Sequence, residues 1–258
     1  MSSFSRRFTG AASALALAVL LAPAPARAQR NDSKIQSDAQ HELRDKRFNG
    51  VQVQVHDGVV RLTGEVNTYA DKEEAAKKVE HMHEAANIQN DINVGGQRGA
   101  SNVSDEELQR KLAKALAYDR VGYGTTMFNA ITLQVHNGVV TLGGVVYGPP
   151  DKDSALSLVK NTPGVRDVID HIQVAPPSPM DDRIRHEEAR SIYGFPQLNR
   201  YALNPAKPIR IVVVNGHVTL AGTVDSKGDK DVAGIRANSV PGVFSVQNDL
   251  QVAGQNER

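Results

Sequence analysis

The sequence predicts an α+β protein made of three tandem small modules, each a three-stranded mixed sheet with two helices on one face. The main observation is a 38-residue pattern that occurs three times without gaps, at residues 57–94, 137–174 and 215–252. Apolar patterning in every copy gives the order helix, strand, strand, helix, strand (αββαβ). The period of about 80 residues suits a small domain better than the unit of a solenoid.

The first 28 residues have the pattern of a secretory signal peptide. Arg6 and Arg7 precede an apolar run at residues 11–22, and residues 26–28 fit a small-x-small cleavage site. The apolar run is too short to span a bilayer. We therefore expect an exported protein, which stays in the periplasm or is secreted.

Charge and cysteine content exclude several classes of function. Without the signal, the chain holds 27 basic and 29 acidic side chains, a net charge of −2. This balance argues against a nucleic-acid partner held by bulk positive charge. The chain has no cysteine, which excludes disulfides, thiol catalysis and cysteine-based metal sites. Each module therefore depends on a small apolar core for its stability.

The first two strands of each module are expected to form a β-hairpin. Apolar and polar residues alternate through residues 51–55, 131–135 and 209–213, as in a strand with one buried face. A dipeptide that tolerates the positive φ angles of a type I′ turn follows each run. These dipeptides are Asp57-Gly58, Asn137-Gly138 and Asn215-Gly216. The return strands end on Gly64, Gly144 and Gly222, which suggests a kink or the close approach of another segment.

Two helices and a last strand complete each module. Helical spacing of apolar residues predicts the first helices at 32–47, 104–116 and 181–192. The second helices carry Asp71, Asp151 and Asp229 in their first turns, where acidic residues are favourable. We interpret these aspartates as turn and capping residues rather than as acid-base catalysts. The last strands are expected at 88–94, 168–174 and 246–252.

These elements give a signal at residues 1–28 and modules at residues 32–95, 104–175 and 180–253. The linker at residues 95–103 contains glycine and serine and is predicted to be flexible. The linker at residues 175–179 is rich in proline and is predicted to be short and stiff. We therefore expect the last two modules to hold a more fixed relative orientation than the first two.

The modules resemble the BON family, small modules found in bacterial envelope proteins and osmotically induced periplasmic proteins. Copy three carries the resemblance most fully, in Gly-x-Val-x-Leu-x-Gly-x-Val at 216–224, Pro-Gly-Val at 241–243 and Val-x-Asn-x-Leu-x-Val at 246–252. The first motif recurs at 58–66 and 138–146, whereas copy one lacks the Pro-Gly pair. The resemblance implies an envelope protein that binds phospholipid or another envelope polymer or protein, and it supplies no catalytic residue.

No catalytic, cofactor or metal site is predicted. His81 and His83 lie two residues apart, which places them on different sides of a helix. His56 and His136 stand just before the hairpin turns, and we interpret them as exposed strand-end residues rather than metal ligands. No serine has the surroundings of a nucleophile elbow, and the glycines form no dinucleotide-binding motif.

Six of the ten aromatic residues outside the signal lie in the loops between the first helix and the hairpin of copies two and three. They are Tyr118, Tyr123, Phe128, Tyr193, Phe195 and Tyr201. One interpretation is that the rings seal the open end of each core, because large rings usually bury most of their area. The other is that exposed rings and nearby basic residues contact anionic lipid or a protein partner. Those basic residues are Arg120, Arg200, Lys207 and Arg210.

The sequence thus predicts a non-catalytic, exported binding protein of the cell envelope, with a role in envelope or osmotic stress. It would contact the phospholipid membrane surface or envelope proteins, and three weak sites on one chain would raise its avidity. The alternative is a periplasmic, chaperone-like stress protein that binds unfolded clients. Exposed sheet edges also allow chains to associate, so the oligomeric state stays open.

Overall fold

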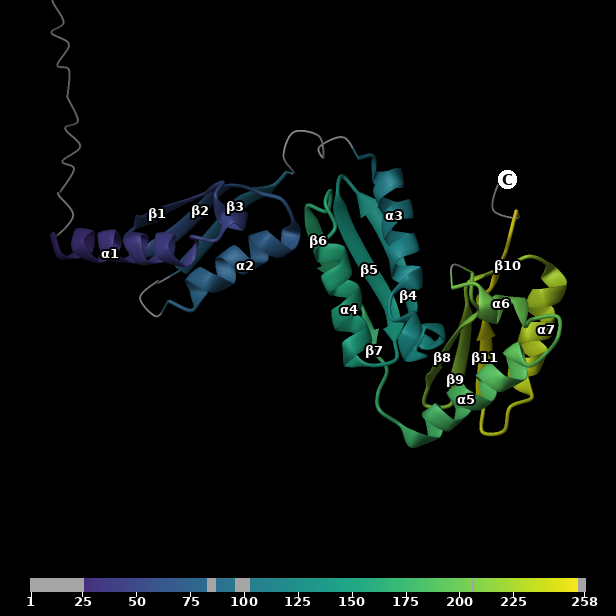
Figure 1. The fold of residues 1–258 in the computed structure, drawn as a ribbon. Coiled ribbons are helices and arrows are strands. Elements are labelled where there is room, and N and C mark those ends of the chain that lie inside the picture. Colours follow the sequence, from purple (N-terminus) through teal and green to yellow (C-terminus); the bar gives the residue numbers. More distant parts are fainter. Residues whose placement is uncertain (1–25, 83–86, 96–102, 206, 255–258) are drawn as a thin grey trace, which may run out of the picture.

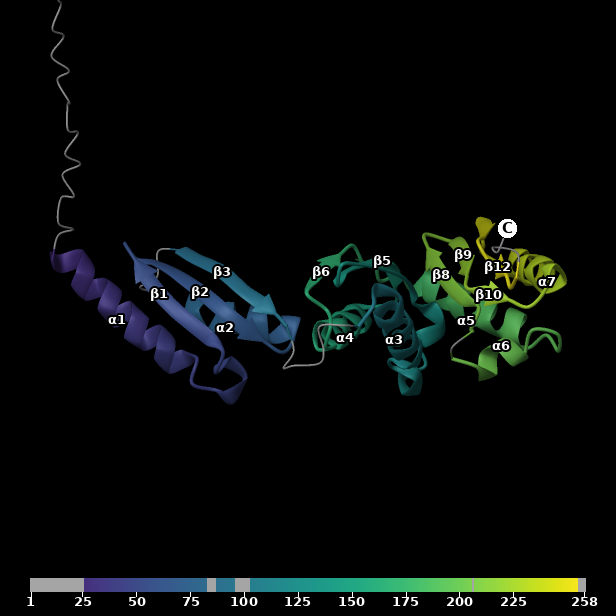
Figure 2. The same cartoon turned by 90° about the horizontal axis from the view of Figure 1, so that it is seen from above.

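The computed structural model describes residues 26–82, 87–95, 103–205 and 207–254. They form three α+β units, modules 1, 2 and 3, which follow one another along the chain and do not share a sheet (Figure 1 and Figure 2). The predicted fold class is therefore confirmed. Most of the predicted signal peptide falls in residues 1–25, outside the described residues.

Module 1 shows the shared architecture. Its elements are α1 (Ala26–Glu42), the 3-10 helix η1 (Lys46–Phe48), β1 (Val51–His56), β2 (Val59–Val66), α2 (Tyr69–Glu80) and β3 (Asn87–Val94). The sheet has the order β1-β2-β3, with β1 antiparallel and β3 parallel to the central β2. Both helices pack on one face of the sheet, and their apolar stripes bury a core with Val60 and Leu62 of β2 (Figure 2).

Modules 2 and 3 repeat this order with a last strand that is broken in two. Module 2 contains α3 (Asp105–Tyr118), η3 (Val121–Tyr123), η4 (Thr126–Phe128), β4 (Ala130–His136), β5 (Val139–Val146), α4 (Pro149–Lys160), β6 (Asp167–Asp170) and β7 (Gln173–Val174). Module 3 contains α5 (Pro179–Tyr193), α6 (Arg200–Leu203), β8 (Arg210–Val214), β9 (His217–Ala221), β10 (Thr223–Val224), α7 (Lys227–Asn238), β11 (Ser245–Asn248) and β12 (Gln251–Val252). The hairpin strands are again antiparallel and the last strand is parallel to the central one.

The first helix differs from its predicted range of 32–47. Helix α1 ends at Glu42, and η1 follows because the Asp45 carboxylate accepts the Arg47 backbone N–H at 3.0 Å and caps a new turn. This turn brings Phe48 into the core of module 1, where the ring is 1% exposed.

The predicted hairpin turns are confirmed, whereas the return strands of modules 1 and 2 continue past the glycine to Val66 and Val146. Both residues of each turn dipeptide have positive φ angles, which a type I′ turn requires. Gly64 and Gly144 also have positive φ, of 109° and 93°. A Cβ at either position would lie 2.0 Å from a backbone carbonyl oxygen of the neighbouring strand end, so only glycine fits.

An aspartate of the first helix holds each hairpin turn, which was not predicted from the sequence; Asp105 and Asp181 lie in the first turn of α3 and α5, and Asp32 lies further along α1. Asp181 is 1% exposed, and its carboxylate accepts the backbone N–H groups of Asn215 and Gly216 at 2.9 and 2.8 Å. Asp32 and Asp105 hold the turns of modules 1 and 2 in the same way. The hydrogen bonds from the backbone N–H groups of Gly138 and Asn137 hold the pKa of Asp105 below its ordinary value.

We predict that Asp181→Ala lowers the free energy of unfolding of module 3 by about 2 kcal/mol, because it leaves two backbone N–H groups near the core without a hydrogen-bond acceptor. Urea unfolding followed by circular dichroism measures the loss. Glu187→Ala, on the exposed side of the same helix, is the control and should change the stability by under about 0.5 kcal/mol. Equal stability of the two variants would show that the Asp181 carboxylate does not stabilise the hairpin turn.

Candidate functional site

The structure brings the two aromatic loops together at the junction of modules 2 and 3, although Tyr118 and Tyr193 are the last residues of α3 and α5 rather than loop residues. Phe128 is 6% exposed and packs into the core of module 3 rather than that of module 2. Its ring centroid lies 5.9 Å from that of His186 on α5, and 5.9 Å from that of Tyr147. Phe48, which has the same place in module 1, stays in its own core. Phe128 is therefore an anchor between modules.

Three of the other predicted aromatic residues also close the core of module 3. Tyr201 is 2% exposed, while Tyr193 and Phe195 are partly buried against the same core. The Tyr193 hydroxyl donates to the Ile209 carbonyl, and burial raises the pKa of this phenol. The Arg236 guanidinium lies 5.5 Å from the centre of the Phe195 ring. These rings fit the interpretation that the loops seal the open end of the core.

Tyr118 and Tyr123 are placed differently, because their side chains stand in solvent. They are 52% and 71% exposed, and Val121 between them is 45% exposed. The Arg120 guanidinium lies 4.2 Å from the centre of the Tyr123 ring, within the range of a cation–π contact. On the module 3 side, Leu203 is 78% exposed. The three module 2 side chains, Tyr118, Val121 and Tyr123, are called the exposed rim below.

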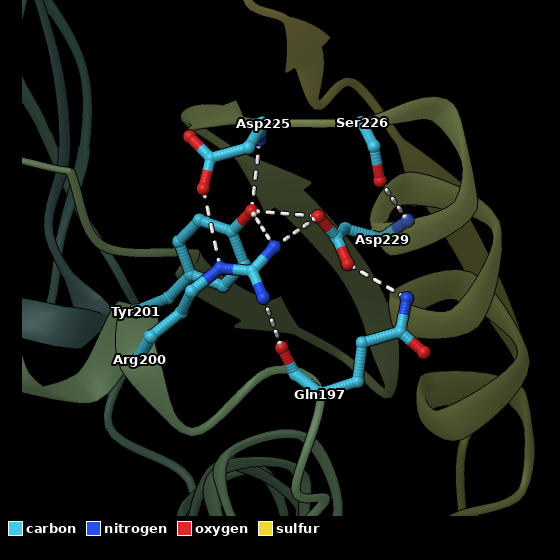
Figure 3. A network of polar contacts seen from close by, with 6 residues as sticks. All are labelled: Gln197, Arg200, Tyr201, Asp225, Ser226 and Asp229. Atoms are coloured by element: carbon cyan, nitrogen blue, oxygen red, sulfur yellow. Dashed lines mark hydrogen bonds and ion pairs between the residues drawn. The ribbon is translucent and has the colours of Figure 1, made fainter.

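A buried aspartate ties the aromatic loop of module 3 to α7 (Figure 3). Asp229 is 1% exposed and accepts hydrogen bonds from Gln197 at 2.7 Å, Arg200 at 2.5 Å and the Tyr201 hydroxyl at 2.9 Å. Burial acts to raise the pKa of Asp229, but these hydrogen bonds and the Arg200 charge outweigh it, so the pKa stays below its ordinary value.

An aspartate at the start of the second helix binds an arginine in the other two modules as well. In module 2, Asp151 pairs with Arg120 at 3.1 Å and accepts the Thr125 hydroxyl at 2.6 Å. In module 1, Asp71 pairs with Arg47 at 3.3 Å. The predicted first-turn aspartates are thus structural, as the sequence analysis inferred, but their arginine partners were not foreseen.

A cleft of about 520 Å³ opens between modules 2 and 3. Its apolar lining includes Leu116 of α3 with Ile131 and Leu133 of β4, and module 3 contributes Lys207 and Arg210. A smaller cavity of about 120 Å³ is lined by Val121, Tyr193 and Tyr201, and Arg210 also lines it. The larger volume is in the range of small-molecule sites.

Arg210 places a positive charge in the lining of this cleft. The guanidinium donates to the Thr126 carbonyl across the junction and forms no ion pair with an acidic side chain among the described residues. Burial lowers the pKa of Arg210. A half-buried guanidinium without a counter-ion is suited to a carboxylate or phosphate, which it can bind through two parallel hydrogen bonds.

The junction of modules 1 and 2 has a different character. Lys160 of α4 pairs with Glu73 of α2 at 2.7 Å, and Tyr69 packs against the core of module 2. Burial, with a hydrogen bond and the charge of Asp167, raises the pKa of Tyr69 to about 12. No fully buried ring crosses this junction in the part of the chain that the structure describes.

Among the described residues, no three histidine or acidic side chains lie close enough together to hold a metal ion. No helix in that part of the chain is both long and apolar enough to cross a membrane.

We predict that Phe128→Ala lowers the stability of module 3, although Phe128 belongs to module 2 in sequence. The substitution leaves a cavity in the module 3 core, which costs about 3 kcal/mol. Amide hydrogen exchange in α5 and β8 measures the effect. Phe48→Ala is the control and should speed exchange in module 1 alone. Unchanged exchange in α5 and β8 would contradict the anchoring role of Phe128.

Comparisons with known proteins point to one family. The family described as BON domain matches residues 31–96, 104–176 and 197–254. A relative from Escherichia coli strain K12, osmotically-inducible protein Y, is 27% identical over 160 residues, which cover 58% of this chain and 73% of the relative.

Solved structures give only weak likenesses. The C-terminal domain of CdsD, a structural protein of the type III secretion system of Chlamydia trachomatis, has a TM-score of 0.25 at 14% identity, covering 84% of this chain and 96% of that one. The periplasmic domain of PrgH from S. typhimurium has a TM-score of 0.19 at 11% identity, covering 85% and 99%. Scores this low give no basis for transferring a function.

Proposed function

The chain belongs to the BON domain family, and we propose that it is a non-catalytic binding protein of the bacterial envelope that contacts anionic phospholipid at the junction of modules 2 and 3. The predicted signal peptide supports export to the periplasm. The relative named osmotically-inducible protein Y supports a role in the response to osmotic stress.

The observation that carries the lipid proposal is the exposed rim beside an unpaired cation. Tyr118 and Tyr123 remain in solvent although the other loop rings are buried or partly buried. Tyrosine is favourable at the membrane interface, where its ring meets the acyl boundary and its hydroxyl stays hydrated. Lys207 and Arg210 line the adjoining cleft and would attract anionic headgroups, while Asp119 and Asp151, which line the same cleft, hold Ser154 and Arg120 respectively.

Tyr118→Ser combined with Tyr123→Ser should reduce binding to anionic vesicles at least about tenfold, because it removes two interfacial rings without opening a core. Co-sedimentation with phosphatidylglycerol-containing liposomes measures the binding. Phe244→Ser is the matched control, since Phe244 is 80% exposed but lies near the hairpin turn of module 3, away from the cleft. Phe128→Ser is unsuitable here because it disrupts the junction.

Three outcomes of this experiment are informative. Loss of binding in the tyrosine variant with retention in the Phe244 variant supports the rim as the contact. Equal binding by all three proteins contradicts the proposed site. Failure of the unchanged protein to sediment with anionic vesicles contradicts the lipid proposal itself.

The presence of three modules in one chain is explained if they bind the same membrane surface at the same time. Linked weak sites act at a high effective concentration, so the full chain should bind anionic vesicles at least about a hundredfold more tightly than residues 29–95 alone. Surface plasmon resonance on captured vesicles compares the two, after circular dichroism has shown that the fragment is folded. Equal affinity would exclude multivalency as the reason for three copies.

The alternative proposal is a chaperone-like protein for unfolded clients. Its support is the set of large apolar side chains exposed at separate places on module 3, Leu203 at 78%, Ile235 at 69% and Phe244 at 80%. A client-aggregation assay separates the proposals, because a chaperone would suppress aggregation without preferring anionic lipid.

A further inference from the structure

Glu188, on α5 of module 3, is a buried acid without a partner. The residue is 0% exposed, and neither of its carboxyl oxygens has a hydrogen-bond partner. These two oxygens are the only buried, unpartnered side-chain polar atoms in the part of the chain that the structure describes. Such a group is costly in a folded core, so its presence needs a physical explanation.

The other two modules show that Glu188 occupies a core position. The turn-clamping aspartates set the register of the first helices, and Glu188 stands seven residues after Asp181. The residues seven places after Asp105 and Asp32 are Leu112 and Ala39, both 0% exposed and both in the core of their module. Module 3 therefore has a carboxyl group where its sister modules have an aliphatic side chain.

The neighbours of α5 offer this carboxyl group no cation. On α5 itself, Arg185 pairs with Asp182 at 2.5 Å and donates to the Val213 carbonyl at 2.6 Å. On α7, Arg236 donates to the Ser191 carbonyl at 3.0 Å, and on β8, Arg210 donates to the Thr126 carbonyl. None of the described residues forms an ion pair with Glu188.

The remaining groups packed around α5 do not change this picture. The His186 ring contacts the Asp182 carbonyl at 2.7 Å, and the Tyr193 hydroxyl donates to the Ile209 carbonyl. The side chains that complete the core beneath α5 are aliphatic: Ile184, Ile192, Ile211, Val213, Ala233 and Ala237. The carboxyl group therefore has an apolar environment in which only its neutral form is stable.

Helix α5 also carries contacts of the junction. The Arg185 guanidinium lies 5.2 Å from the centre of the Tyr147 ring, and the His186 ring lies 5.9 Å from Phe128. A movement of α5 away from its sheet would loosen the module 3 core and these contacts together.

We propose that Glu188 makes module 3 a pH-responsive unit: its carboxyl group is neutral while α5 is packed, and its ionisation releases α5 from the sheet and from module 2. This inference goes beyond the proposed function and does not depend on lipid binding. The same release would reshape the cleft around Arg210.

The direction of the pH dependence follows from proton linkage. Burial raises the pKa of Glu188 to about 8, against 4.5 for the ordinary side chain. The packed state then holds its proton more tightly than the open state. The stability that this proton provides is complete below pH 4.5 and is lost as the pH rises toward about 8. Between these values the equilibrium constant for opening rises roughly tenfold per pH unit.

Amide hydrogen exchange of the full mature chain at pH 6 and pH 8, corrected for the intrinsic exchange rates, tests the proposal. The opening constant of α5 should rise by about fiftyfold, whereas that of α3, with Leu112 at the same place, should stay nearly constant. Glu188→Leu copies module 2 and should remove the dependence in α5. Glu188→Gln keeps the shape without the charge and should do the same.

Glu187→Gln is the matched control, because this neighbouring acid is exposed and pairs with Arg190. It should retain the full pH dependence of α5. Three results would each overturn the proposal: equal pH dependence in α5 and α3 of the unchanged protein, a dependence that survives both Glu188 substitutions, or one that Glu187→Gln abolishes. The unchanged protein alone decides the first, so a variant that fails to fold leaves the test intact.

Discussion

The insertion of Phe128 into the core of its neighbouring module is the contact on which the candidate site depends. The ring fills space in module 3 and is buried there, so modules 2 and 3 share part of one core. Because this contact holds residues 118–129 beside residues 193–205 and 207–210, the cleft, the unpaired Arg210 and the exposed rim lie at one place. A junction held only by surface ion pairs would be weaker, since such pairs contribute little in water.

Within each module, two aspartates connect segments that are distant in the sequence. One in the first helix holds the hairpin turn, and one at the start of the second helix holds an arginine of the preceding loop. Except for Asp32, which lies inside α1, these aspartates are in the first turn of their helix, where a carboxylate is favourable. The loops between these fixed points differ in length among the modules, so modules 2 and 3 can carry aromatic loops that module 1 lacks without loss of the common fold.

Local chemistry made most of the fold predictable. The turn dipeptides, the close approach at the return-strand glycines and the apolar periodicities each act over a few residues, and the structure bears them out. The partners of Asp71 and Asp151 were missed because they lie 24 and 31 residues earlier, across loops of unequal length. The sequence could not show that Phe128 belongs to the core of module 3, because the contacts of a ring in a loop depend on how the two modules are placed. The burial of Glu188 could have been predicted from the sequence, because alignment of the three first helices matches it with the core residues Leu112 and Ala39.

The junction connects the proposed function and the proposed pH response, because Phe128, Arg210 and α5 meet there. If the shared core holds modules 2 and 3 as one body, the exposed rim has a fixed shape that a membrane surface can meet. Residual dipolar couplings of the backbone amides, measured by NMR on the full mature chain at pH 6, test this most directly. A single alignment tensor should fit modules 2 and 3 together in the arrangement of Figure 1. Separate tensors for the two modules would contradict a shared core.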